Sequence, residues 1–221
     1  MSKKIDEHRQ AHPDEPWLWN PEWAERRLLP LEKPGAIVGF WVVGVLVLGT
    51  CYLIPRSVGA DLSDVFGMVI WGLALLLALF GVLALVMAVN KTRAFRRYRQ
   101  VWLELDTVPG IIGDRFSATL RTLTGFPPDA QAALLLLCTS RTRFKQSDNS
   151  YFKTLWRQEG AASVSGRDIP LVFDLPADMP ECQLEPPETG EPWITWDLQV
   201  KVKSADVPFS ALFRVPVFKK R

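Results

Sequence analysis

Two long apolar runs dominate the first half of the chain. Residues 35–54 and 65–89 contain no charged side chain. At about 1.5 Å per residue in an α-helix, each run is long enough to cross the roughly 30 Å hydrocarbon layer of a bilayer. The pattern predicts two transmembrane helices, with Pro55 ending the first one and a short polar loop at 55–64 connecting them.

After residue 100 the apolar positions change to a period of two, which is typical of strands with one buried face. Seven short strands are predicted, separated by turns rich in Gly, Pro, Asp and Asn. They lie at 101–105, 116–120, 132–138, 151–156, 169–175, 194–202 and 209–217. This spacing favours an antiparallel β-sandwich of the immunoglobulin-like type.

The predicted fold class is therefore an α+β membrane protein with four parts. A tail at 1–34 precedes a transmembrane hairpin at 35–90, a basic linker at 91–100 and a β-sandwich at 101–221.

The distribution of basic residues predicts how the hairpin is oriented. Basic residues are concentrated after the second run: Lys91, Arg93, Arg96, Arg97 and Arg99. The loop at 55–64 holds one Arg and two Asp. The positive-inside rule places both termini in the cytoplasm, with the short loop outside. Alternatively, these arginines bind an anionic lipid.

Small residues recur along the second run at a spacing that places them on one stripe of a helix. They are Ala74, Ala78, Gly81 and Ala88, and the first run begins with a GxxxG formed by Gly35 and Gly39. Such stripes let two helices approach closely. Packing of the hairpin is the simpler interpretation, and contact with a second copy or a partner helix is the alternative.

The tail contains Trp17, Trp19 and Trp23 within seven residues. Asn20 followed by Pro21 is a helix-start signal, which predicts a short helix through about Leu29. One interpretation is that the indoles anchor the tail at the membrane interface. The alternative is that they dock on the C-terminal domain or on another protein.

The segment from His12 to Ala24, HPDEPWLWNPEWA, resembles the opening signature of an uncharacterised family of bacterial inner-membrane proteins. The similarity extends through the two apolar runs, the turn from Pro109 to Gly113 and the closing strands. The resemblance implies the same architecture and a location in the bacterial inner (cytoplasmic) membrane, and it supplies no catalytic residues. Separately, residues 169–176, 193–203 and 213–218 are similar to strand pairs of arrestin-like sandwiches, which implies a protein-binding adaptor role.

The sequence offers little support for catalysis or metal binding. No His follows Val101, so that region cannot form a Ser-His-Asp or Cys-His site internally. His8 and His12 are a weak metal signal because no third ligand of that kind accompanies them. The acidic, Pro-rich stretch at 174–191 reads as a solvated loop, with calcium binding a minor alternative. As the most conspicuous irregular surface of the domain, it is also the first candidate for a partner-binding edge. Cys51, Cys138 and Cys182 read as free thiols, and a disulfide between the last two would contradict a cytoplasmic domain.

Composition adds two exclusions to this picture. With 26 Lys and Arg against 24 Asp and Glu, the net charge of +2 gives no sign of a nucleic-acid partner. The two runs hold no ionisable residue, which disfavours transport by a single copy. We expect a non-enzymatic inner-membrane protein without catalytic residues, cofactor or metal. Its partners are membrane lipids and another protein, which the cytoplasmic β-sandwich binds, for example as an assembly or regulatory subunit of a membrane complex. An oligomeric pore is the alternative, and an enzyme using surface carboxylates is a third.

Overall fold

The structure is a computed structural model of the chain. It describes residues 9–31, 35–59, 64–98, 100–127, 129–143, 150–164, 166–184, 191–204 and 208–220. The chain forms two compact units: Met1–Glu32 together with Gln100–Arg221, and Lys33–Arg99. The N-terminal segment, which the sequence suggested as a separate tail, therefore belongs to the same unit as the strands.

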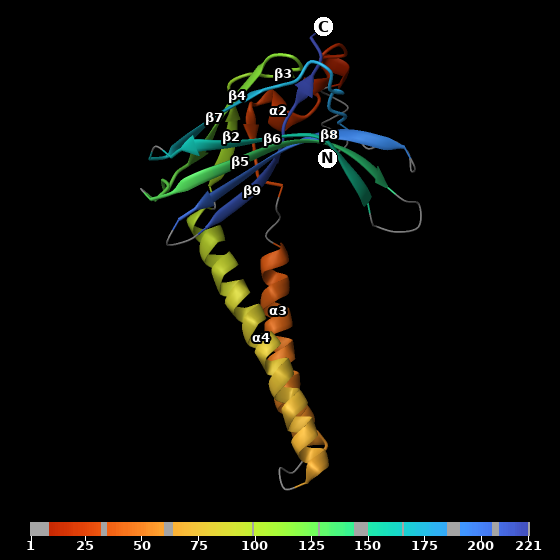
Figure 1. Cartoon of the computed structure of the whole chain (residues 1–221), viewed down its shortest axis with the longest axis vertical. Coiled ribbons are helices and arrows are strands. Elements are labelled where there is room, and N and C mark those ends of the chain that lie inside the picture. The colour runs from red at the N-terminus through yellow and green to blue at the C-terminus, as the bar shows by residue number, and fades with distance from the viewer. Residues whose placement is uncertain are drawn as a thin grey trace. The chain divides into compact units, whose positions relative to one another are not determined.

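The second unit is a pair of long antiparallel helices, α3 (Gly35–Ser57) and α4 (Val65–Arg97) (Figure 1). Both are long and apolar enough to cross a membrane, and most of their large apolar side chains are exposed. Pro55 lies inside α3 and does not end it, since a proline in the last turn removes only one helical hydrogen bond. α4 continues beyond the apolar run into the basic segment and ends at Arg97, through residues that favour helix.

Small residues allow α3 and α4 to approach closely. A Cβ at Gly81 would lie 2.9 Å from Leu48 Cγ, and one at Gly44 would lie 2.6 Å from Leu85 Cδ2. Ala88 is fully buried. One turn further along α4, Trp41 Nε1 donates to Thr92 Oγ1 over 3.1 Å.

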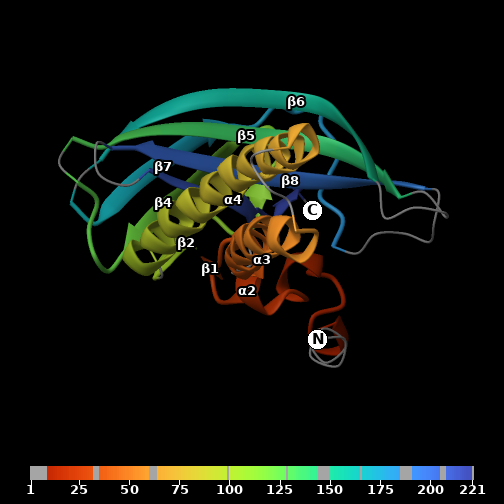
Figure 2. The ribbon, with the colours of Figure 1, turned by 90° about the horizontal axis from the view of Figure 1, so that it is seen from below.

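The first unit contains two four-stranded antiparallel sheets and one short strand pair. Sheet A has the order β1 (Arg27–Leu28), β2 (Val101–Leu105), β4 (Arg115–Thr122), β7 (Asp168–Asp174). Sheet C has the order β6 (Ser150–Ser163), β5 (Gln131–Arg143), β8 (Pro192–Lys203), β9 (Phe209–Arg214), and forms an arch in Figure 2. In the parallel pair, β3 (Gly110–Ile111) runs beside β10 (Val217–Phe218).

The sandwich core lies between the buried faces of the two sheets. Alternate positions of sheet A are buried, including Leu103, Phe116 and Phe173, and so are Trp196 and Phe213 of sheet C. A Cβ at Gly160 would be 3.6 Å from Phe173 Cε1 and 3.7 Å from Leu134 Cβ, so the sheets meet at this corner.

Most of the predicted strands correspond to observed ones, but their bounds and number differ. The described part of 101–221 forms nine strands instead of seven, because the turn after the cis Val108–Pro109 bond contains β3 and the last predicted strand is divided into β9 and β10. The strand predicted at 132–138 continues to Arg143 as one arm of a long hairpin.

Candidate functional site

The N-terminal segment closes one side of the sandwich. It contains a single 3-10 turn, η1 (Pro16–Leu18), and the helix α2 (Pro21–Ala24), whose N-cap Asn20 accepts a hydrogen bond from the Glu22 amide over 3.0 Å. The predicted continuation of this helix to Leu29 is wrong. Arg26 has a φ of 56°, which ends the helical path, and the next two residues pair with β2 as β1.

Trp23 fixes this segment to the sandwich. It is 1% exposed, its Nε1 donates to the Arg214 carbonyl over 3.1 Å, and its ring meets Phe218 edge-on at 6.2 Å. Further along, the Leu31 amide donates to the Leu212 carbonyl over 2.8 Å. The segment thus joins the edge strand of sheet A to the edge strand of sheet C. For Trp23, docking on the C-terminal domain replaces the alternative of a lipid anchor, because no part of its ring is free to reach lipid.

Trp17 and Trp19 lie at the surface beside this contact. The Trp17 ring is 5.7 Å from that of Phe218, and the Trp19 Nε1 donates to the His12 carbonyl over 2.7 Å. The Arg9 guanidinium is 4.7 Å from the centre of the Trp19 ring. Both indoles are only half-buried, so they are the part of the tryptophan motif that remains available to a partner.

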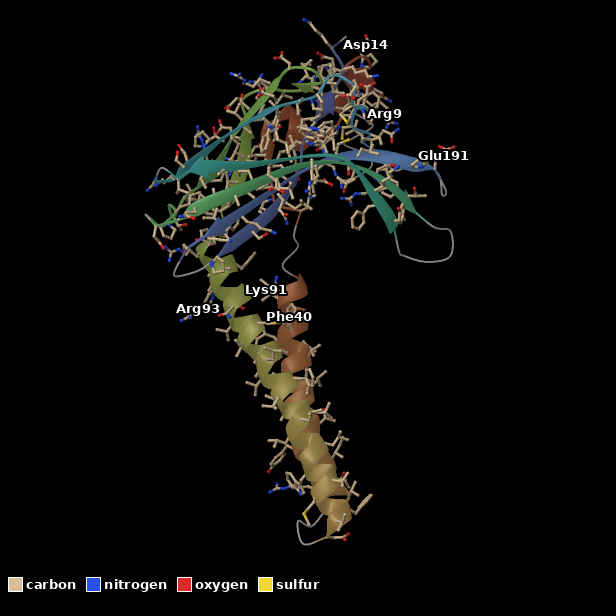
Figure 3. The ribbon with its side chains drawn as sticks, viewed as in Figure 1. Arg9, Asp14, Phe40, Lys91, Arg93 and Glu191 are labelled. Carbon is tan, nitrogen blue, oxygen red and sulfur yellow. The ribbon has the colours of Figure 1, made fainter. Side chains whose placement is uncertain are left out.

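A shallow hollow of about 450 Å³ lies beside Trp19. Residues of the N-terminal segment, the loop after β7 and the C-terminal end line it, including Arg9, Cys182 and Lys219. Figure 3 shows Arg9 and Asp14 in this part of the sandwich unit. The hollow contains both signs of charge, since Glu181 is also in its wall.

A buried ionic cluster lies on the other side of sheet C, facing away from the core. Asp197 is 2% exposed. Its carboxylate accepts hydrogen bonds from Arg141 Nη2 over 2.6 Å, from Arg214 Nε over 3.3 Å and from Thr195 Oγ1 over 3.1 Å. The Thr195 hydroxyl also lies 2.9 Å from that of Thr139, so the cluster connects β5, β8 and β9.

The hairpin of β5 and β6 contains a register break beside this cluster. Cys138 is opposite Trp156 and Thr139 is opposite Thr154, so Leu155 is the extra residue of a β-bulge. Beyond it the strand carries exposed aromatic residues, with Tyr151 62% and Phe152 67% exposed. Because of this extra residue, the side chains before the bulge face the opposite side from the one they would face in an unbroken strand. Phe152 therefore lies opposite Arg141, on the outer side of the sheet.

All three cysteines are free thiols, and two of them are buried. Burial raises the pKa of Cys138 to about 12, with the nearby Cys182 and Asp197 adding to the effect. Burial raises the pKa of Cys182 to about 11. Neither thiol has the exposed, cation-stabilised environment that makes a cysteine reactive.

The remaining predicted positions are the basic residues at the end of α4, the small residues of the two helices, and a few residues that the structure does not describe. Arg93, Arg96 and Arg97 lie in the last turns of α4, and Figure 3 shows Lys91 and Arg93 at the end of the hairpin near Phe40. Ala74 and Ala78 are half-buried on the stripe that includes Gly81 and Ala88. Gly39 approaches no atom of another element within 4 Å, so it is not part of the helix contact, while Gly35 begins α3. Arg99, His8 and residues 185–190 lie outside the described residues.

Within the described part of the chain, no group of three or more His, Cys, Asp or Glu is placed to hold a metal ion. His12 Nδ1 lies 3.5 Å from Glu15 Oε2, and both side chains are about half exposed. The sequence analysis did not predict the Asp197 cluster. An acidic residue between Trp196 and Leu198 in a strongly apolar strand is the sequence feature that indicates it.

Comparison with known proteins gives a distant likeness at most. No family model matches the chain, and no curated protein matches it. Among solved structures, the chain is similar to the sporulation control protein Spo0M from Bacillus subtilis, with 14% identity and a TM-score of 0.33 over 55% of this chain and 49% of that one. The matched region thus spans about half of that protein, and nothing about function is inferred from it.

Proposed function

We propose that this protein is a membrane-anchored, non-enzymatic interaction module in which α3 and α4 cross the bilayer and the sandwich binds another protein. The proposal includes a bacterial inner membrane with both termini in the cytoplasm. Its support is the length and apolar surface of the two helices and the basic residues in the last turns of α4. An immunoglobulin-like or arrestin-like type for the sandwich is part of the same proposal and comes from the strand pattern.

The edge strand β6 carries the protein-binding part of the proposal. Of the four outer edges of the two sheets, three are protected against pairing with another strand. β1 has only two residues, β9 accepts hydrogen bonds from Leu31 and Trp23, and β7 carries Pro170 between charged ends.

In contrast, β6 is 14 residues long and contains no proline, and among the described residues it pairs only with β5. Tyr151 and Leu155 are exposed along it. A long edge of this kind is a template on which a partner adds a strand through main-chain hydrogen bonds, while side-chain contacts provide specificity. This edge is therefore the surface that we assign to a protein partner.

The test compares two substitutions of matched exposure on different edges. The full chain is purified in mild detergent as Tyr151→Asp and as Val172→Asp, because Tyr151 is 62% and Val172 57% exposed. We expect a stoichiometric partner, identified by mass spectrometry, to be lost with Tyr151→Asp and kept with Val172→Asp. Loss from both variants, or a partner-free homo-oligomer in every sample, would contradict the proposal.

The topology has a separate test. Reporter domains that are active on only one side of the membrane are fused after Arg221 and inserted between Ser57 and Asp64. We expect the C-terminal reporter to be active inside and the inserted one outside. The reverse pattern would overturn the orientation without affecting the assignment of β6.

A further inference from the structure

The outer face of sheet C, on the side away from the core, carries an excess of positive charge. The strand registers place Arg157 of β6 opposite Leu137, and Lys201 and Lys203 of β8 opposite Ala133 and Gln131. Alternation places these residues on the side of Asp197, away from the buried Trp196 and Leu198. We call this set the basic face. Its charged members are Arg141, Arg157, Lys201, Lys203 and Arg214 against Glu159 and Asp197.

Five cations against two acids leave a net charge of +3 on the described part of this face. One of the two acids is already neutralised, since Asp197 lies between Arg141 and Arg214. Lys201, Lys203 and Arg157 are exposed and form no ion pair with any described residue. The lysines are two positions apart on one strand, so their side chains project on the same side from Cα atoms about 7 Å apart.

Apolar side chains accompany these cations. Phe152, opposite Arg141, is 67% exposed on the same face, and half-buried leucines at 135, 137 and 212 lie between the charged positions. Aromatic residues beside Lys and Arg are typical of surfaces that meet the headgroup region, where the ring enters the apolar boundary and the cations meet lipid phosphates.

We propose that the basic face docks on anionic lipid headgroups of the membrane that α3 and α4 span. This inference rests on the membrane anchoring proposed above. The face and the membrane have complementary charge, because clustered Lys and Arg are attracted to the negative cytoplasmic leaflet. The sandwich unit ends at Glu32 and α3 begins at Gly35, so the sandwich is tethered to the membrane and meets the lipid at a high effective concentration.

The test uses the full chain in lipid nanodiscs. Ser210, which is exposed opposite Lys201 on the basic face, is replaced by Cys and labelled with a donor dye in a Cys51→Ala background. The buried Cys138 and Cys182 stay unlabelled at neutral pH because burial raises the pKa of both thiols. Energy transfer to dye-labelled headgroups then reports how close the face lies to the lipid, and a label at Val172→Cys reports the outer face of sheet A.

We expect stronger transfer from Ser210→Cys in discs that contain phosphatidylglycerol than in phosphatidylcholine alone, and no such increase at Val172→Cys. Lys201→Glu together with Lys203→Glu should lower the ratio of docked to undocked protein on the order of 25-fold or more, since each lost cation changes it by roughly fivefold. The control Lys219→Glu with Lys220→Glu changes the net charge equally on other exposed lysines and should leave the transfer unchanged.

Three outcomes would overturn the inference. Equal transfer in both lipid mixtures, or equal loss in the two double variants, would remove lipid docking while leaving membrane anchoring intact. The energy transfer could be insensitive to charge while the Lys201, Lys203 variant loses an acidic partner protein. That result would assign the face to that protein. A chain that fails to enter the nanodiscs would contradict the anchoring itself, and docking with it.

Discussion

The outer faces of the two sheets differ in how their charges are balanced. On sheet A, cations and acids are equal in number: Arg27, Arg115 and Arg121 against Glu104, Asp168 and Asp174. Arg121 lies 2.9 Å from Glu104 and Arg115 lies 3.3 Å from Asp174, so the charges pair within the face. On sheet C the charge is unbalanced, and exposed lysines have no described partner.

This imbalance identifies sheet C as the side of the sandwich that is suited to partners outside the chain. A surface with interspersed, paired charges of both signs is well suited to water. Sheet C differs because it has excess cations, an exposed aromatic ring and an unprotected edge strand. Its charge can attract an acidic partner, and its apolar area can be buried against one. Sheet C therefore carries both of the interactions that we propose, lipid on its face and protein at its β6 edge.

The largest effect is expected where the N-terminal segment joins the two sheets. Trp23→Ala removes a fully buried indole and its hydrogen bond to the Arg214 carbonyl, and should lower the free energy of unfolding of the sandwich by about 3–5 kcal/mol. Denaturant unfolding in detergent, followed by circular dichroism of the β signal, measures it. Trp17→Ala, at a half-buried position, is the control and should cost clearly less. Equal costs would mean that the segment is only loosely attached.

The second effect compares one carboxylate from each outer face. Asp197→Ala leaves two guanidinium groups without their buried partner and should cost about 2–4 kcal/mol, a value reduced because both arginines reach solvent. Asp174→Ala removes an exposed pair with Arg115 and should cost less than about 1 kcal/mol. The same unfolding measurement applies to both. A similar cost for the two variants would show that the Asp197 cluster is no more than a surface ion pair.

A smaller effect should appear at alkaline pH. Because burial raises the pKa of Cys138 to about 12 and that of Cys182 to about 11, the folded state keeps thiol protons that the unfolded chain releases above its ordinary thiol pKa of about 8.5. Stability from these groups is full below that value and falls as pH rises toward the folded pKa values, by at most about 1.4 kcal/mol per pH unit for each thiol. Cys138→Ala and Cys182→Ala variants should flatten this part of the pH profile. Unchanged slopes would assign the loss to other groups.

The long-range pattern of the chain made the helices and most strands predictable. Two uncharged runs and a later change to period two define which segments are helices and which are strands, because side-chain periodicity follows directly from helix and strand geometry. The ends were less predictable. α4 continues through its basic residues to Arg97, and α3 continues past Pro55 to Ser57. Basic residues or a proline near the end of a helix therefore do not by themselves determine where the helix ends.

The features that matter most for the sandwich depend on contacts between distant residues. Trp23 is 191 positions from Arg214, whose carbonyl it contacts, and no local pattern indicates this pairing. Alternation correctly places Asp197 opposite the core side of β8, but it does not show that Arg141 and Arg214 cover it. The bulge at Leu155 likewise reverses the facing of Tyr151 and Phe152, which an unbroken period of two would misplace.

The assignment of β6 as the protein-binding edge is tested most directly by photo-crosslinking in cells with the full chain. A photoreactive phenylalanine analogue replaces Tyr151 on the β6 edge or Val172 on β7, two exposed positions on different edges. We expect a discrete protein adduct from position 151 that is absent from position 172. The same adducts from both positions, or an adduct only from position 172, would contradict the assignment of β6 as the protein-binding edge.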